Sequence, residues 1–477
     1  MLLPPELLTL PVDFDTLAFY TGLACAGTAI GAVFTHDHSD CPHDISGKKQ
    51  RIAELEKTSP RTLEQNDELA DLYMDIAGCG AEDSDDFDSI IALYDKAEAV
   101  IKDALAQGED TELQRKLANA YLNRAVALND YDLLDDAAKY YQLAVETLSP
   151  LDAAGDGEAT YDLAGVKLNL GIIYRENGEL EQAKTILEDS FLLYRKIEKI
   201  GLFDTRYYMA TTSVQQGGVL FEMHEPLDKI TDAYNRAMRL LVEVIEDGQQ
   251  LELERDLADT LLDRCAAIYH DILDREFDSV TERDNKIGDI LIDVGRSIEL
   301  LEKQFKSGNE EARADLFNAL IMQSKILMDI EKLSEGRKIL DRAVSEFPDY
   351  ASPEHPMLAN EYAVAYESRA ECALGANDAD AALADFSEAV RIREELLKDR
   401  EALDPEDLNL FIPQLAAAIA SRATVQAVKG DKAAAVKEIQ RAMDLLNSLN
   451  QTGEEGELID DVKEQLQEVL HSIQADE

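Results

Sequence analysis

Basic residues are scarce in this chain. Its 477 residues include 46 Lys and Arg against 98 Asp and Glu, which gives a formal net charge of −52 at pH 7. Nucleic-acid binding depends on clustered Lys and Arg that neutralise phosphates, so this composition argues against a nucleic-acid partner. We expect a charged protein partner to be basic instead. A simpler interpretation is that acidic faces keep the protein soluble or suit a salty environment.

Tryptophan is absent and cysteine is rare. The five cysteines are scattered, odd in number and without a Cys-x-x-Cys pair, so the sequence predicts no disulfide framework. A reducing compartment fits best, and we expect the chain to be cytoplasmic. With 45% hydrophobic and 30% charged residues, the composition is that of a folded protein rather than a disordered one.

The sequence motifs of common enzyme and cofactor sites are also missing. The chain has no Gly-x-Ser-x-Gly, no Gly-x-x-x-x-Gly-Lys-Ser/Thr, no His-Glu-x-x-His and no Gly-x-Gly-x-x-Gly. Pairs of carboxylates abound, but in so acidic a chain they carry little information. We therefore predict a protein that is not an enzyme and needs no cofactor.

Long uncharged runs are limited to residues 16–34, TLAFYTGLACAGTAIGAVF. Their length matches a bilayer span of about 20 residues. Ala, Gly and Thr dominate the run, however, its flanks are acidic, and no basic segment precedes it as in a secretory signal. Three interpretations stay open: a packed helix of a soluble protein, a membrane anchor that gives membrane association, and a cleaved signal.

A histidine-rich stretch, THDHSDCPHD, follows this run and gathers His36, His38, Cys41 and His43. Its start resembles the zinc motif of the metallo-β-lactamases, but Cys41 stands where the last histidine is expected and no β-rich region surrounds it. Four nitrogen and sulfur ligands suffice for a tetrahedral zinc site. A solvated polar linker explains the same residues, and we predict no metal site here.

A glycine stands inside an apolar helical run in LNLGIIYRENGELEQA, residues 168–183. Gly171 and Tyr174 precede a break at Gly178, and Ala183 follows it. Glycine inside a helix costs about 1 kcal/mol relative to alanine, so Gly171 indicates a close helix crossing.

The pattern recurs along the chain. Second-helix triads, whose members are separated by three and then two residues, occur eight times; they start at Ile90, Ala137, Ala183, Ile230, Ile290, Gly336, Ala382 and Ala435. Twelve residues before seven of these eight triads stands a small residue: Gly78, Ala125, Gly171, Gly218, Ser324, Ala370 or Ala423. The fifth unit has Asp278 there instead, and its small residues 265–267 are displaced by a polar stretch that predicts an inserted loop or a helix extension.

These residues resemble the tetratricopeptide repeat (TPR) family, in which two antiparallel helices pack through such small residues. The resemblance covers about residues 63–449. Its departures are the missing tryptophan, the few prolines and a spacing of 46 or 47 residues between the first triads, which predicts long second helices such as residues 180–200. The resemblance implies an all-α, right-handed α-solenoid of about eight TPR-like helical hairpins. We divide the chain into an N-terminal segment (1–60), the superhelix (61–450) and a C-terminal capping helix (451–477).

The resemblance also implies that the first helices line a concave groove, where equivalent residues stack in a row. Two residues before the small residue stand three amides, Asn123, Asn169 and Gln216, whereas other units have Ile76, Met322, Ser368 and Ser421. Some TPR proteins bind the backbone of an extended peptide with such a ladder, because an amide offers both a donor and an acceptor. The same amides could simply solvate the groove.

Other TPR modules clamp an acidic C-terminal tail with cations, and Lys116, Arg124 and Lys167 lie near the amides. The surrounding acidity makes this clamp the weaker choice. We therefore predict a non-catalytic scaffold that binds a peptide or helix of a protein partner through Asn123, Asn169 and Gln216. The alternatives are a membrane-tethered assembly protein and a metal-dependent regulator or hydrolase that uses the His36 cluster.

Overall fold

The computed structural model describes residues 45–82, 87–108, 110–248, 253–274, 279–398, 403, 405–449 and 454–475. Throughout these residues the regular structure is helical, without a strand. The prediction of an all-α chain of TPR-like hairpins is confirmed. The described residues divide into two compact units, an N-terminal unit that ends at Asp271 and a C-terminal unit that begins at Ile272.

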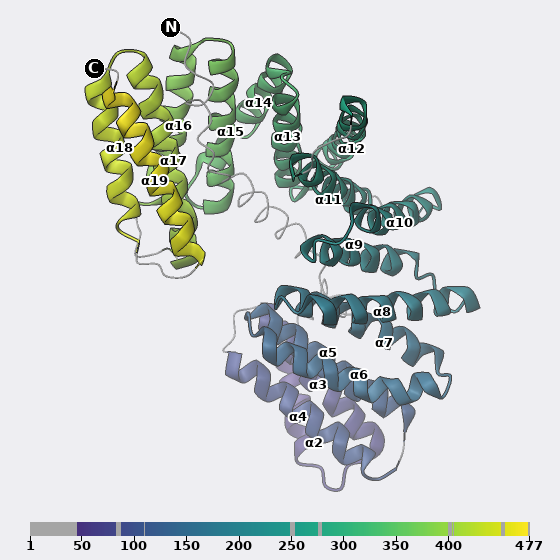
Figure 1. Ribbon diagram of the computed structural model, residues 1–477. Coiled ribbons are helices and arrows are strands. Elements are labelled where there is room, and N and C mark those ends of the chain that lie inside the picture. The colour runs from purple at the N-terminus through teal and green to yellow at the C-terminus, as the bar shows by residue number, and fades with distance from the viewer. Residues whose placement is uncertain are drawn as a thin grey trace. The chain divides into compact units, whose positions relative to one another are not determined.

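The N-terminal unit is a stack of helical hairpins (Figure 1). Each first helix from α3 to α9 packs on the second helix that follows it, and each second helix from α4 to α8 also packs on the next first helix. Its elements are α2 (Ile45–Glu56), α3 (Leu63–Glu82), α4 (Phe87–Leu105), α5 (Thr111–Asp130), α6 (Leu134–Ala153), α7 (Gly157–Glu176), α8 (Leu180–Ile200), α9 (Arg206–Glu222), α10 (Leu227–Glu246) and α11 (Leu253–Asp274).

The C-terminal unit continues the same construction. Its elements are α12 (Val280–Lys306), α13 (Ala312–Asp329), α14 (Leu333–Glu346), the 3-10 helix η3 (Pro348–Ala351), α15 (Pro356–Gly375), α16 (Ala379–Leu396), α17 (Pro405–Val428), α18 (Lys432–Leu446) and α19 (Glu454–Ala475). The described part of the polar stretch in the fifth unit forms the first turns of α12, so there it is a helix extension. Helix α19 packs on α17 and α18, which confirms the predicted capping helix.

Helix α2 lies inside the predicted N-terminal segment and packs on α3. Ile52 and Leu55 are its buried side chains. Arg51 adds a two-pronged ion pair to Glu68, with Nε 2.7 Å from Oε1 and Nη2 2.8 Å from Oε2. The packed part of the chain therefore begins before the first complete hairpin.

The crossing of α7 and α8 explains Gly171. A Cβ atom on this residue would lie 2.6 Å from both Cγ and Cδ2 of Leu187. Leu187 and the neighbouring Ala183 are fully buried, and Ser190 Oγ donates a hydrogen bond of 2.7 Å to the carbonyl of Ala164. The two helices approach more closely than a side chain at position 171 permits, as the sequence pattern predicts.

Replacing Gly171 with leucine should therefore overfill this crossing. We expect the free energy of unfolding to fall by about 1–3 kcal/mol, measured by chemical denaturation. The exposed change Glu181→Gln on α8 serves as the control and should stay within about 0.5 kcal/mol of the wild type. Equal denaturation midpoints for the two variants would mean that the helix register is wrong.

The turn inside each hairpin requires one residue in the left-handed region. Gly178 has φ +72° and Gly430 has φ +95°, but Asp132, Glu331 and Asn377 adopt the same conformation with φ between 58° and 61°. Each of these five residues follows the small first-helix residue by seven positions. In the α9–α10 hairpin the left-handed residue is His224, with φ 52°, which follows Gly218 by six positions and Gly217 by seven. The predicted break at Gly178 is confirmed. The position of the turn within the repeat is more regular than the type of residue that occupies it.

One stretch among the described helices, Leu408–Val428 in α17, is long and apolar enough to cross a bilayer by length and composition. A buried core helix passes the same test, and here Phe411, Leu415 and Ile419 pack in one core with α18 and α19. Residues 16–34, the run that the sequence singled out, lie outside the described residues.

Candidate functional site

The three amides of the predicted row lie on successive first helices of the N-terminal unit. Asn123 is on α5, Asn169 on α7 and Gln216 on α9. Ion pairs between residues 47 positions apart fix the register: Arg115 Nε lies 2.9 Å from Asp162 Oδ2 across α5 and α7, and Arg175 Nε lies 2.7 Å from Glu222 Oε1 across α7 and α9. Measured from the left-handed residue of each hairpin turn, Asn123 and Asn169 both stand nine residues before it (Asp132 and Gly178), whereas Gln216 stands eight before His224. Asn123 and Asn169 are therefore equivalent, and Gln216 is displaced by one residue.

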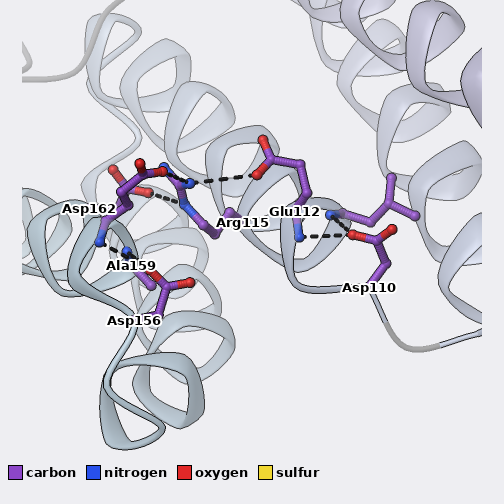
Figure 2. A network of polar contacts seen from close by, with 8 residues as sticks. Asp110, Glu112, Arg115, Asp156, Ala159 and Asp162 are labelled. Carbon is purple, nitrogen blue, oxygen red and sulfur yellow. Dashed lines mark hydrogen bonds and ion pairs between the residues drawn. The ribbon is translucent and has the colours of Figure 1, made fainter.

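The N-terminal ends of α5 and α7 are held together by Arg115 (Figure 2). Asp110 caps α5 and Asp156 caps α7, each accepting two backbone N–H bonds of 2.9–3.1 Å. Arg115 pairs with Asp162 and Glu158 of α7 and lies 3.6 Å from Glu112 of its own helix. One guanidinium thus bridges the two helices on which Asn123 and Asn169 stand.

Burial and ion pairing compete at this bridge. Burial raises the pKa of Asp162 above its usual value, although the hydrogen bond from Arg115 opposes that rise. Burial disfavours the charged form of Arg115, but its pairs with Asp162 and Glu158 outweigh this, so the pKa of Arg115 is raised. The arginine stays charged and keeps the helices in register.

The three amides do not share one environment. Asn123 is half-buried, and its side chain makes no hydrogen bond to the rest of the described chain. Asn169 is only 4% exposed, and its Nδ2 has no hydrogen-bond partner among the described residues. Gln216 is half-buried, and its Oε1 accepts a bond of 2.5 Å from Arg236 Nη2 of α10. Their common role in binding a peptide stays a prediction.

Asn169 lies beside a second helix as well as in the row. The hydroxyl of Tyr141 on α6 is a neighbouring polar group: burial raises the pKa of this tyrosine, and the contact with Asn169 opposes that rise. Asn169 is therefore enclosed between α6 and α7, and its side chain is more buried than expected for a residue that faces only the groove.

Arg175 of α7 forms a polar cluster with α9 that the sequence did not predict. Its Nε bonds to Glu222, and its Nη1 donates to Gln215 Oε1 at 3.0 Å. Gln215 is 1% exposed, and within the described residues its Nε2 has no hydrogen-bond partner. Gly218 seats the arginine, because a Cβ there would lie 2.5 Å from Arg175 Cζ. Gly218 thus makes room for a guanidinium, whereas the adjacent Gly217 makes room for α10, because a Cβ there would lie 2.7 Å from Tyr234 Cζ.

A fourth residue, Asp263 on α11, continues the row, since it follows Gln216 by 47 positions and stands two residues before Cys265. Burial raises the pKa of its carboxyl to about 7, although Arg175 opposes the rise. The fifth unit had been aligned on its displaced second-helix triad. Alignment on its small residues 265–267 would have revealed Asp263 from the sequence.

The raised pKa of Asp263 predicts a pH-dependent cost. An aspartate in the unfolded chain titrates near pH ~3.9, so from there to about pH 7 the folded protein keeps a proton that the unfolded chain has lost. Stability from this group therefore falls as the pH rises through that window. We expect the stability advantage of Asp263→Asn over the wild type to grow by about 2 kcal/mol between about pH 5 and about pH 8, measured by urea denaturation. A constant difference would contradict this assignment.

The cations of the alternative clamp are already paired. Lys116 of α5 binds Asp71, with Nζ 2.9 Å from Oδ2, and also Asp67. Arg124 binds Asp95, and Lys167 Nζ lies 2.6 Å from Asp189 Oδ2. An acidic tail would have to displace these carboxylates, so the geometry gives the clamp no support.

In the described part of the chain, no group of three or more His, Cys, Asp or Glu side chains is placed to hold a metal ion. The four candidates from the sequence, His36, His38, Cys41 and His43, lie outside that part. Cys265 of α11 and Cys372 of α15 are both buried.

No model of a known protein family matches the chain, and no curated protein matches its sequence. Among solved structures it is similar to a tetratricopeptide repeat protein from Parabacteroides merdae, with 14% identity, a TM-score of 0.36 and coverage of 73% of this chain and 98% of that one. It is also similar to the apo form of RapI, with 13% identity, a TM-score of 0.47 and coverage of 85% and 99%.

A third similar structure is a Rap protein complexed with Competence and Sporulation Factor, at 12% identity and a TM-score of 0.38, covering 98% of this chain and 100% of that one. At this level of similarity, these structures resemble the chain only in being helical-repeat proteins. The TPR-like class of the chain rests on its own hairpins, its small-residue crossings and its repeated turns.

Proposed function

We propose that this chain is a non-catalytic protein-interaction scaffold that binds a peptide or a helix of a partner along the first helices of its N-terminal unit. The row of Asn123, Asn169 and Gln216 would supply the contacts, with Asp263 as its fourth member. The observation that carries the proposal is that these amides lie on successive first helices, and that the half-buried Asn123 side chain makes no hydrogen bond to the rest of the described chain.

Buried polar groups without partners are costly. Each costs about 1–3 kcal/mol, and folded proteins leave few of them. An extended peptide offers one carbonyl acceptor and one N–H donor per residue, and primary amides can bond to both. A bound backbone would pair with the half-buried Asn123, which has no hydrogen-bond partner among the described residues, and with the half-buried Gln216 on the other side of Asn169.

Charge gives the partner a preferred character. The net charge of −52 favours a basic protein segment and disfavours nucleic acid, whose phosphates it would repel. Attraction of this kind weakens as salt is added. We place the scaffold in the cytoplasm, and fractionation of the full chain separates this proposal from a membrane-tethered protein.

Affinity capture from the native lysate, followed by mass spectrometry, tests the proposal. The bait is the full chain, compared with the triple variant Asn123→Ala, Asn169→Ala, Gln216→Ala. A matched control replaces three exposed amides outside the row with alanine: Gln107, Gln182 and Gln440. We expect specific partners on the wild type and the control but not on the row variant. A row variant that keeps every partner would remove these residues from the site.

A further inference from the structure

Three arginines on α8 and α10 differ from most arginines of the N-terminal unit. Most arginines of this unit form an ion pair with a carboxylate: Arg51, Arg115, Arg124, Arg175, Arg206 and Arg255. Arg195, Arg236 and Arg239 form none within the described residues. In a chain with 98 acidic and 46 basic residues, cations that gather without a carboxylate are unexpected.

Arg236 is fixed at the centre of this group. Its guanidinium lies over the ring of Phe191, 4.6 Å from the centroid. Its Nε donates to Ser213 Oγ at 2.9 Å and its Nη2 to Gln216 Oε1 at 2.5 Å. Nη1 makes no hydrogen bond to the rest of the described chain, so one edge of an oriented guanidinium is left for a ligand.

Helical spacing brings the other two arginines near Arg236: Arg195 lies one turn after Phe191 on α8, and Arg239 one turn after Arg236 on α10. Burial lowers the pKa of Arg236, and the charges of Arg239 and Arg195 lower it further. Asp232 and Glu188 act in the opposite sense, but neither forms an ion pair with Arg236. Arg195 and Arg239 are exposed and Arg236 is half-buried, and no carboxylate of the described chain is bonded to any of the three guanidinium groups. We call these three residues the arginine patch.

We propose that the arginine patch binds the side-chain carboxylates of an acidic segment of a partner protein. Guanidinium groups bind carboxylates through two parallel hydrogen bonds. Because Arg195 and Arg239 stand on different helices and each offers a whole fork, the patch suits several carboxylates along a segment better than one compact phosphate. The patch lies on second helices, so the inference goes beyond the row of first-helix amides.

The net negative charge of the chain does not prevent such binding. Exposed charges separated by more than about 8 Å are largely screened at physiological ionic strength, so the nearest charges decide the interaction. An acidic segment that binds at this ionic strength, against the overall repulsion, would have to do so through a local group of cations.

The test uses the full chain and a fluorescent oligoglutamate peptide, with binding followed by fluorescence anisotropy at physiological ionic strength. The variant Arg195→Gln/Arg239→Gln removes the two exposed cations and leaves Arg236 in its packed position. The control Arg51→Gln/Lys139→Gln removes two positive charges from exposed residues elsewhere in the same unit. Circular dichroism of each variant checks that it is folded.

We expect the peptide to bind the wild type and the control with similar affinity and to bind the patch variant at least about tenfold more weakly. Equal weakening in both variants would show a bulk charge effect and overturn the proposal. Absence of binding to the wild type would overturn it as well. Inorganic phosphate is the competing probe, and binding of phosphate without binding of the peptide would contradict the assignment to carboxylates.

Discussion

Replacing Arg393 with methionine is expected to lower the free energy of unfolding of the C-terminal unit by about 3–5 kcal/mol. Arg393 of α16 is 1% exposed. It forms a two-pronged ion pair with Glu367 of α15, with distances of 2.6 and 2.9 Å, and its Nε donates to Asn360 Oδ1 at 3.0 Å. Methionine would leave the Glu367 carboxylate and the buried Asn360 oxygen without their donor.

Its control is Arg391→Met, two residues earlier on the same helix. Arg391 is exposed and pairs only with Glu388 on its own helix among the described residues, so this change should stay within about 0.5 kcal/mol of the wild type. Chemical denaturation followed by circular dichroism measures both variants. Similar losses in the two would mean that the buried network contributes no more than a surface pair.

A second variant separates loss of the ion pair from loss of packing. Because removing one partner of a buried pair is costly while replacing both with apolar residues is often neutral, Arg393→Met/Glu367→Leu should recover much of the stability lost in Arg393→Met. A double variant as unstable as the single one would instead assign the loss to the shape of the arginine side chain.

The triple variant Asn123→Ala, Asn169→Ala, Gln216→Ala should bind the natural partner about tenfold to about two-thousandfold more weakly, as measured by titration calorimetry. This range follows from about 0.5–1.5 kcal/mol for each hydrogen bond lost, if the three act independently. Because the proposed contacts are to peptide backbone, the loss should be similar for different peptide sequences. We expect the stability to change by no more than about 1 kcal/mol, mainly because Arg236 loses its bond to Gln216.

The hairpins and their register were accessible from the sequence because small residues at helix crossings repeat with the chain. Gly171 meets Leu187 as the spacing predicts, and α8 spans Leu180–Ile200, the long second helix expected at residues 180–200. Helical periodicity and close packing both depend on residue size, which a single sequence displays directly.

Features that depend on long-range polar contacts were not accessible in the same way. In the sequence, Arg393 cannot be told from the other charged residues of an amphipathic helix. Its partners Glu367 and Asn360 are 26 and 33 positions away. The sequence pattern predicts a helix–helix crossing at Gly218, but the space beside its Cα is occupied by the guanidinium of Arg175. Residue type alone does not say which partner a charge will find.

The placement of the amides on successive first helices was predictable, but their environment was not. The spacing of 46 and 47 residues places Asn123, Asn169 and Gln216 on α5, α7 and α9, with Gln216 displaced by one residue relative to its turn. Burial of Asn169 beside Tyr141 and the bond from Arg236 to Gln216 arise from second helices, whose side chains the repeat pattern does not specify at those positions. Asp263 was missed because the fifth unit departs from the spacing of the others.

Titration of the captured partner's binding segment into the wild type, the row variant and the three-glutamine control tests the scaffold proposal most directly. Calorimetry gives each affinity, and thermal melting of the same samples gives their stability. The account predicts a loss of at least about tenfold in the row variant alone, with closely similar melting temperatures in all three proteins. Equal affinity for the wild type and a normally folded row variant would contradict it.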